Sequence, residues 1–216
     1  IVIHESGHEY WGNSVSMNDV ADMWIHESFC TYTEALYVEQ LYGYNSMLEY
    51  LMYQKDFISG RSPILGVHGV NQKGNSTDMY YKGSWMLHSI RNTLNNDSLW
   101  FSIVKGIAHD FLIKNCDGTE IIDYMCNASG LDLKPIFQQF LVHANLPVLS
   151  YKFKNKRGKL ELYYKWEAAE VNFNMPIDIS VGNSEKFRIF PNSNYQSLYL
   201  GNTDKKRVKF SEELFL

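Results

Sequence analysis

The sequence contains few cysteines and no long hydrophobic run. Its three cysteines, Cys30, Cys116 and Cys126, are an odd number and lack the paired spacing of a metal-binding cysteine motif. A framework of disulfide bonds is therefore not expected. No apolar run approaches the roughly 20 residues that a helix needs to span a bilayer, so no membrane segment is predicted.

Dense positive charge is also scarce. The chain has 20 lysines and arginines against 24 acidic residues, a formal net charge of −4. Its one compact basic run, residues 205–207, is short and typical of a solvated turn. These features argue against nucleic acid as a partner. Hydrophobic residues make up 45% of the chain and aromatic residues 15%, which is enough for a buried core.

Helical periodicity dominates the first two thirds of the chain. Residues 61–77 are rich in glycine, serine and asparagine and are predicted to form a loop. The predicted helices after the first one cover residues 18–42, 45–59, 79–94, 97–112, 119–127 and 133–144.

The pattern changes near Pro147, after which short β-rich runs alternate with turns. One run places Leu160, Leu162, Tyr164 and Trp166 on one face of a predicted strand. We therefore expect a multi-domain α and β protein, with a mainly helical domain at residues 1–146 and a small β-sandwich at residues 147–216.

The residues most able to carry chemistry begin at His4, in the run His-Glu-Ser-Gly-His that ends at His8. Residues 4–11 are predicted to be helical, and the four-residue spacing then puts both imidazoles on one face, able to share a metal ion. Glu5 would lie near that ion without being needed as a ligand. Because such a pair also occurs by chance on core or surface helices, further residues must support the assignment.

A catalytic zinc site uses three protein ligands and keeps a fourth position for water, so two histidines leave it one ligand short. Glu27 is the candidate for the third ligand. It lies 19 residues after His8, in the next predicted helix, with enough chain between them to turn back. Zinc would lower the pKa of a bound water, and Glu5 could take its proton during attack on a peptide carbonyl.

These motifs resemble those of the gluzincin zinc aminopeptidases, a family typified by aminopeptidase N and leukotriene hydrolase. The shared pattern is His-Glu-x-x-His, a tail like residues 10–13 (Tyr-Trp-Gly-Asn), and a block like residues 24–29 (Trp-Ile-His-Glu-Ser-Phe). His26 stands where the family usually has asparagine. Residues 117–140 resemble more loosely the end of the family's thermolysin-like catalytic domain, and residues 146–149 resemble the entry into its β-sandwich.

The resemblance implies the roles of the main site residues. His4, His8 and Glu27 would bind one Zn2+ ion, and Glu5 would act as general base and proton shuttle. The family also carries Tyr-x-Lys-Gly, whose tyrosine hydroxyl donates a hydrogen bond to the oxyanion of the tetrahedral intermediate. The matching residues 80–83 assign that catalytic role to Tyr80, with the adjacent tyrosine as its rival.

Glu34 has two interpretations. It lies seven residues after Glu27, two helical turns further along the same face. Its carboxylate could accept a hydrogen bond from the far side of a ligand histidine. It could equally be an ordinary solvated charge on a helix surface.

The sequence therefore favours a zinc metallopeptidase that acts on peptides, with an aminopeptidase as the first hypothesis. The alternatives are a zinc endopeptidase of the same clan and a non-catalytic metal-binding or scaffold module. The helix around His4 lacks a capping residue and an initiator methionine. We therefore expect a longer parent protein, with the family's Gly-x-Met-Glu-Asn loop upstream, and little catalysis by this part alone. Compartment and oligomeric state stay open.

Overall fold

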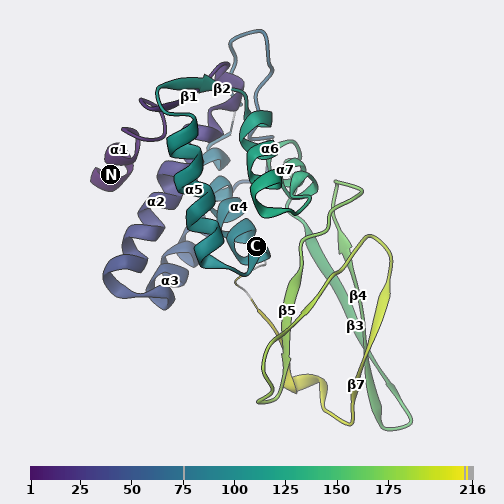
Figure 1. Ribbon diagram of the computed structural model, residues 1–216. Coiled ribbons are helices and arrows are strands. Elements are labelled where there is room, and N and C mark those ends of the chain that lie inside the picture. Colours follow the sequence, from purple (N-terminus) through teal and green to yellow (C-terminus); the bar gives the residue numbers. More distant parts are fainter. Residues whose placement is uncertain (75, 212, 214–216) are drawn as a thin grey trace.

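The computed structural model describes residues 1–74, 76–211 and 213, and Figure 1 shows helices followed by a β-rich part. None of the described helices is long and apolar enough to cross a membrane. The α-helices are α1 (Val2–Gly7), α2 (Trp24–Tyr42), α3 (Tyr44–Lys55), α4 (Asp78–Leu94), α5 (Asp97–Asp110), α6 (Gly118–Ser129) and α7 (Lys134–Leu141).

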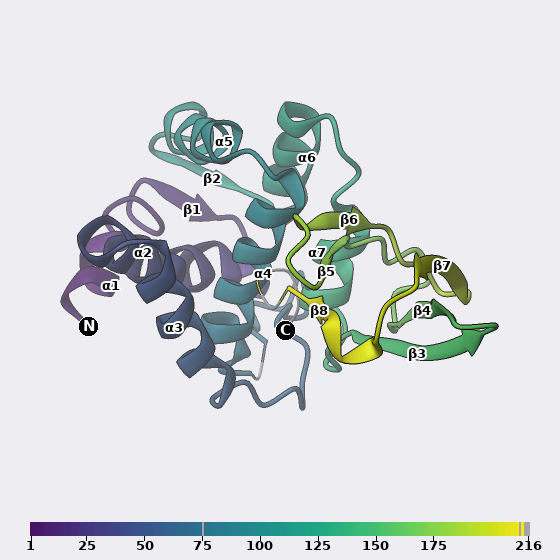
Figure 2. The same ribbon diagram turned by 90° about the horizontal axis from the view of Figure 1, so that it is seen from below.

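Helix α4 is the centre of the helical part. Trp85, Met86, Leu87 and Ile90 are fully buried, and even its polar residues are mostly covered. A helix that is buried on all sides must be surrounded by other elements. Figure 2 shows this arrangement, with α2 and α3 on one side of α4, and α5, α6 and the β-rich part around the others.

Helix α2 begins later than the predicted start at residue 18. The carboxylate of Asp19 accepts a hydrogen bond from the backbone N–H of Ala21 and caps a short 3-10 helix, η1 (Val20–Asp22). The α-helix then starts at Trp24. The aspartate therefore caps the tighter 3-10 turn and not the α-helix itself.

A small parallel sheet lies in the helical part and was not predicted. Strand β1 (Val15–Met17) pairs with β2 (Lys114–Cys116), about a hundred residues further along the chain. The pair connects the loop that follows α1 to the segment that precedes α6. It therefore ties the segment that follows His4 and His8 to the far end of the helical part.

The β-rich part contains two three-stranded sheets, in the orders β3-β4-β7 and β6-β5-β8. Their strands are β3 (Val148–Lys156), β4 (Lys159–Glu167), β5 (Ile177–Val181), β6 (Phe187–Ile189), β7 (Gln196–Gly201) and β8 (Val208–Phe210), with η2 (Lys205–Arg207) before β8. A hairpin joins β3 to β4 through Arg157 and Gly158. Both have positive φ, as a two-residue hairpin turn requires.

Strand β4 confirms the predicted alternation. Leu160, Leu162, Tyr164 and Trp166 are all buried, and the residues between them are more exposed. The indole N–H of Trp166 donates a hydrogen bond to the carbonyl of Met175, just before β5. The apolar face of β4 thus contributes directly to the continuous core of the chain.

A buried lysine joins α4 to the segment between the helical and β-rich parts. The ammonium of Lys82 donates to the carbonyl oxygens of His143 and Ala144, at 2.7 and 3.0 Å. Burial lowers the pKa of Lys82 to about 8. The two carbonyl acceptors compensate part of the cost of burying this cation.

Arg188 of β6 makes a second connection to α4. Its guanidinium donates to the carbonyl oxygens of Asn92 and Thr93, in the last turn of α4, and pairs with the carboxylate of Asp178 on β5. A cation at the carboxyl end of a helix satisfies free carbonyl groups and complements the helix dipole. The β6-β5-β8 sheet is therefore held against α4.

Candidate metal centre

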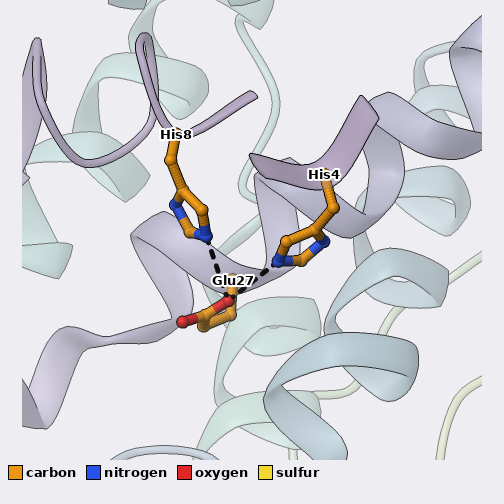
Figure 3. Close-up of side chains that lie close together, drawn as sticks. All are labelled: His4, His8 and Glu27. Atoms are coloured by element: carbon orange, nitrogen blue, oxygen red, sulfur yellow. Dashed lines mark hydrogen bonds and ion pairs between the residues drawn. The ribbon is translucent and has the colours of Figure 1, made fainter. Parts of the chain in front are cut away.

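His4 in α1 and His8, the residue that caps the end of α1, extend toward Glu27 in the first turn of α2 (Figure 3). The Nε2 atoms of His4 and His8 lie 3.2 and 3.7 Å from the same oxygen, Oε2, of Glu27. The assigned helix ends at Gly7, earlier than the predicted end at residue 11. The backbone N–H of His8 still contacts the carbonyl of His4, so one helical turn separates the two imidazoles.

Close packing holds α1 against α2. A side chain at Gly7 would begin 3.2 Å from the sulfur of Cys30, so α1 approaches α2 closely at that point. Further along, the rings of Trp11 and Phe29 stack with centroids 4.3 Å apart. These contacts involve the residues around Glu27 on α2 and therefore fix its carboxylate beneath the two histidines.

The three side chains fit a zinc ion. Their ligand atoms all lie within 4.8 Å of one another. Among the described residues, no other group of three or more acidic, histidine or cysteine side chains converges in this way. Tetrahedral zinc with bonds of about 2.0–2.1 Å places its ligand atoms roughly 3.3 Å apart. The separations of 3.2 and 3.7 Å bracket that value. Two imidazole nitrogens and one carboxylate oxygen also form a donor set that catalytic zinc uses.

The far nitrogen of each histidine also has a partner. His4 Nδ1 lies 2.8 Å from Oε1 of Glu34, and His8 Nδ1 lies 3.0 Å from the carbonyl oxygen of Trp11. The thiol of Cys30 is 3.3 Å from the same Nδ1 of His8. Donation from Nδ1 selects the tautomer whose Nε2 lone pair faces the site, which is the form that binds a metal.

Without a metal the three groups interact with one another. Hydrogen bonds with Glu27 and Glu34 raise the pKa of His4 to about 9. Burial tends to raise the pKa of Glu27, but the hydrogen bond with His4 and the nearby histidine charges outweigh it, so this pKa is lowered overall. At neutral pH the metal-free site therefore carries a proton on His4, which a metal ion must displace.

Tyr80 lies beside His4, in the first turn of α4. Its ring centroid is 5.9 Å from that of His4. Burial raises its pKa, as do the negative charges of Glu27 and Glu5, so the phenol keeps its proton. The rival Tyr81 instead contacts the ring of Phe57, with centroids 5.5 Å apart.

Glu5 belongs to α1, between the two histidines, and its side chain is exposed. Its negative charge contributes to raising the pKa of the Tyr80 phenol and of the Cys30 thiol. Glu5 is not among the converging ligand atoms. An exposed carboxylate at this position is free to accept a proton without competing for the metal.

Sequence reasoning missed one polar side chain near the site. The hydroxyl of Tyr50, on α3, donates a hydrogen bond to Oε2 of Glu34. Tyr50 follows Glu34 by 16 residues and lies on another helix, so no local spacing indicates this contact.

Residues 1–140 match the family model described as the Peptidase family M1 domain, and the chain belongs to that family. The chain is 25% identical to leucyl aminopeptidase of Saccharolobus solfataricus, over 74% of this chain and 22% of that one. It is 28% identical to aminopeptidase N of Lactobacillus helveticus, over 76% of this chain and 21% of the other. The chain thus spans about a fifth of the length of these curated relatives.

Solved structures share the fold. Aminopeptidase A of Legionella pneumophila, in complex with aspartic acid, superposes with a TM-score of 0.70 at 15% identity, over 93% of this chain and 24% of that one. A variant M1 zinc metallopeptidase of Deinococcus radiodurans, bound to a Tyr-Ser-Ala substrate, superposes with a TM-score of 0.59 at 18% identity. That match covers 68% of this chain and 34% of the other.

Proposed function

We propose that the protein is a zinc metallopeptidase, and specifically an aminopeptidase that removes N-terminal residues from peptides. The observation that carries this proposal is the convergence of ligand atoms from His4, His8 and Glu27 within 4.8 Å, with Tyr80 beside them, in a chain of the M1 family. The aminopeptidase names of the curated relatives support removal of N-terminal residues over internal cleavage.

Nε2 of His4, Nε2 of His8 and Oε2 of Glu27 would hold one Zn2+ ion. When bound, zinc lowers the pKa of water and polarises a peptide carbonyl. The hydrogen bond from His4 Nδ1 to Glu34 leaves the Nε2 lone pair of His4 for the metal, and the carbonyl of Trp11 does the same for His8.

The proton transfers fall to Glu5. Its exposed carboxylate takes a proton from the water that attacks the peptide carbonyl, and then passes that proton to the departing amine nitrogen. Because Glu5 is not a metal ligand in this proposal, its carboxylate lone pairs stay available to accept a proton. Tyr80 donates its phenolic hydrogen bond to the carbonyl oxygen as negative charge develops there, and the raised pKa of the phenol keeps this donor protonated.

We further propose two domains, residues 1–146 and residues 147–216. The last helix ends at Leu141 and the first strand of the β-rich part begins at Val148, so the boundary falls in the connecting segment. The catalytic residues all belong to the first domain. The second domain supports it through its contacts with α4, among them the pairing of Arg188 with the helix end.

An assay of the intact protein tests the function. Turnover of an aminoacyl anilide with a free amino group is expected, abolished by a chelator and restored by one equivalent of zinc. The matched substrate is the same anilide with its amino group acetylated, which an aminopeptidase should leave uncleaved. A quenched peptide blocked at both ends detects internal cleavage.

Each alternative gives a different result in these assays. Cleavage of the doubly blocked peptide without turnover of the free anilide would indicate an endopeptidase. Zinc binding with no chelator-sensitive turnover of any substrate would indicate a metal-binding or scaffold module and would overturn the proposed activity.

A further inference from the structure

We infer that Tyr50 is a positioning residue for the ligand His4, acting through the carboxylate of Glu34. The inference rests on the proposed zinc site and extends it to a third helix. The hydroxyl of Tyr50 donates to Oε2 of Glu34, and the other oxygen of Glu34 accepts from His4 Nδ1 at 2.8 Å.

The chain of contacts fixes the His4 ring at both nitrogens. Nδ1 is held by Glu34, and Nε2 lies 3.2 Å from Glu27 on the metal side. Glu34 can hold the ring in one orientation only if its own carboxylate does not rotate. A carboxylate with one partner can turn about its last bond, whereas a carboxylate with a donor on each oxygen is fixed. Tyr50 is the second donor.

Tyr50 is itself placed by the core. On either side of it along α3, Met47 and Leu51 are fully buried. The indole N–H of Trp85 on α4 donates to the carbonyl of Leu51 at 2.8 Å, which fixes the rotation of α3 about its axis. The phenol of Tyr50 is therefore held against α2 by helix packing, and not only by its hydrogen bond.

The environment of Tyr50 favours a permanent donor. Its ring is half-buried, and burial together with the hydrogen bond and charge of Glu34 raises the pKa of the phenol. Glu34 is largely covered, with a side chain that is 21% exposed, so water replaces a lost partner less readily than at an open surface.

Zinc affinity of the intact protein tests the inference by a readout other than activity. The purified protein competes with a chromophoric chelator for zinc, and the zinc affinity of the wild type is compared with that of Tyr50→Phe. We expect the variant to bind zinc about ten-fold more weakly, the lower end of the effect of losing a partner behind a metal ligand. Tyr53→Phe is the matched control, because it makes the same change on α3 at an exposed ring that packs on Phe57. Its affinity is expected to be unchanged.

A double-mutant cycle distinguishes an effect of Tyr50 on the position of His4 from a general effect of Tyr50 on protein stability. Glu34→Gln removes the carboxylate on which Tyr50 acts, so adding Tyr50→Phe to it should cost no further zinc affinity. In the metal-free protein, the NMR resonance of the His4 Nδ1–H proton should shift in Tyr50→Phe and stay in place in Tyr53→Phe.

The outcomes are distinguishable. If Tyr50→Phe lowers the melting temperature but leaves zinc affinity and the His4 resonance unchanged, the contact only joins two helices and the inference is overturned. Additive losses in the cycle would equally overturn action through Glu34. If the wild-type protein binds no zinc, the proposed function itself fails, and this inference with it.

Discussion

The hydroxyl of Ser28 occupies the space in which Gly83 would carry a side chain. Ser28 follows the proposed ligand Glu27 on α2, and its hydroxyl donates to the carbonyl of Met79 on α4 at 2.7 Å. A Cβ atom added to Gly83 would overlap the Ser28 side chain. The contact sets the distance between the helix that carries Glu27 and the helix that carries Tyr80.

We expect Gly83→Ala to destabilise the protein by about 1–3 kcal/mol, the usual cost of overpacking a core. Chemical denaturation of the metal-free protein measures this. Ser28→Gly, which vacates the same space, should recover part of the loss when combined with Gly83→Ala. If the double variant is as unstable as the sum of the two single variants, the overlap is not the cause.

Glu5→Gln should abolish proton transfer while leaving zinc binding intact. General acid-base groups contribute roughly 10²- to 10⁴-fold, so kcat should fall within that range. The control is Glu9→Gln, close to it in sequence, whose carboxylate accepts from Asn13 and takes no part in the mechanism. Zinc content by elemental analysis should be unchanged in both variants, and loss of zinc from Glu5→Gln would contradict its role as a base.

Tyr80→Phe should lower kcat by roughly 10²- to 10³-fold with a smaller change in KM, because the lost hydrogen bond strengthens only as charge develops on the carbonyl oxygen. Tyr81→Phe provides the comparison, since that ring packs on Phe57. Equal losses in the two variants would remove the case for Tyr80 as the oxyanion donor.

Stability should fall in acid because of His88. Burial and the charge of Arg91 lower its pKa from 6.5 to about 3, so the folded protein keeps this imidazole neutral. Below pH 6.5 the unfolded chain binds a proton that the folded chain does not. Stability is therefore lost as the pH falls from 6.5 toward 3, with a slope that approaches about 1.4 kcal/mol per pH unit.

The measurement is the free energy of unfolding of wild type and His88→Gln between pH 7 and pH 4. The difference between them should shrink as the pH falls, since glutamine does not titrate. His109→Gln, at a side chain that is 85% exposed, should follow the wild-type curve. A difference that stays constant with pH would exclude His88 as the source.

The three converging side chains could be predicted from the sequence because they all lie within one short stretch of it, residues 4–27. His4 and His8 lie one helical turn apart, so spacing and helix geometry nominated that pair. Glu27 was a candidate from its position in the next predicted helix, and the resemblance of residues 24–29 to the family's block supported it. The buried face of β4 was predicted for the same reason, because alternation along one strand needs no knowledge of its partners.

Other features depend on contacts that no short window contains. The parallel pairing of residues 15–17 with residues 114–116 joins segments about a hundred residues apart. The start of α2 was misplaced because Asp19 caps a 3-10 turn, and caps for the two helix types look alike in sequence. Tyr50 reaches Glu34 only through the packing angle of α2 and α3, which the core determines.

Helix α4 carries Tyr80 in its first turn and, two residues later, the buried ammonium of Lys82 that holds the carbonyls of His143 and Ala144. Truncation of the chain directly after α7 would remove both carbonyl acceptors and leave the buried ammonium of Lys82 without these hydrogen bonds. This unpaired charge would lie two residues along α4 from Tyr80, the proposed oxyanion donor. The connecting segment is thus a poor place for a cut, a graft or an inserted tag.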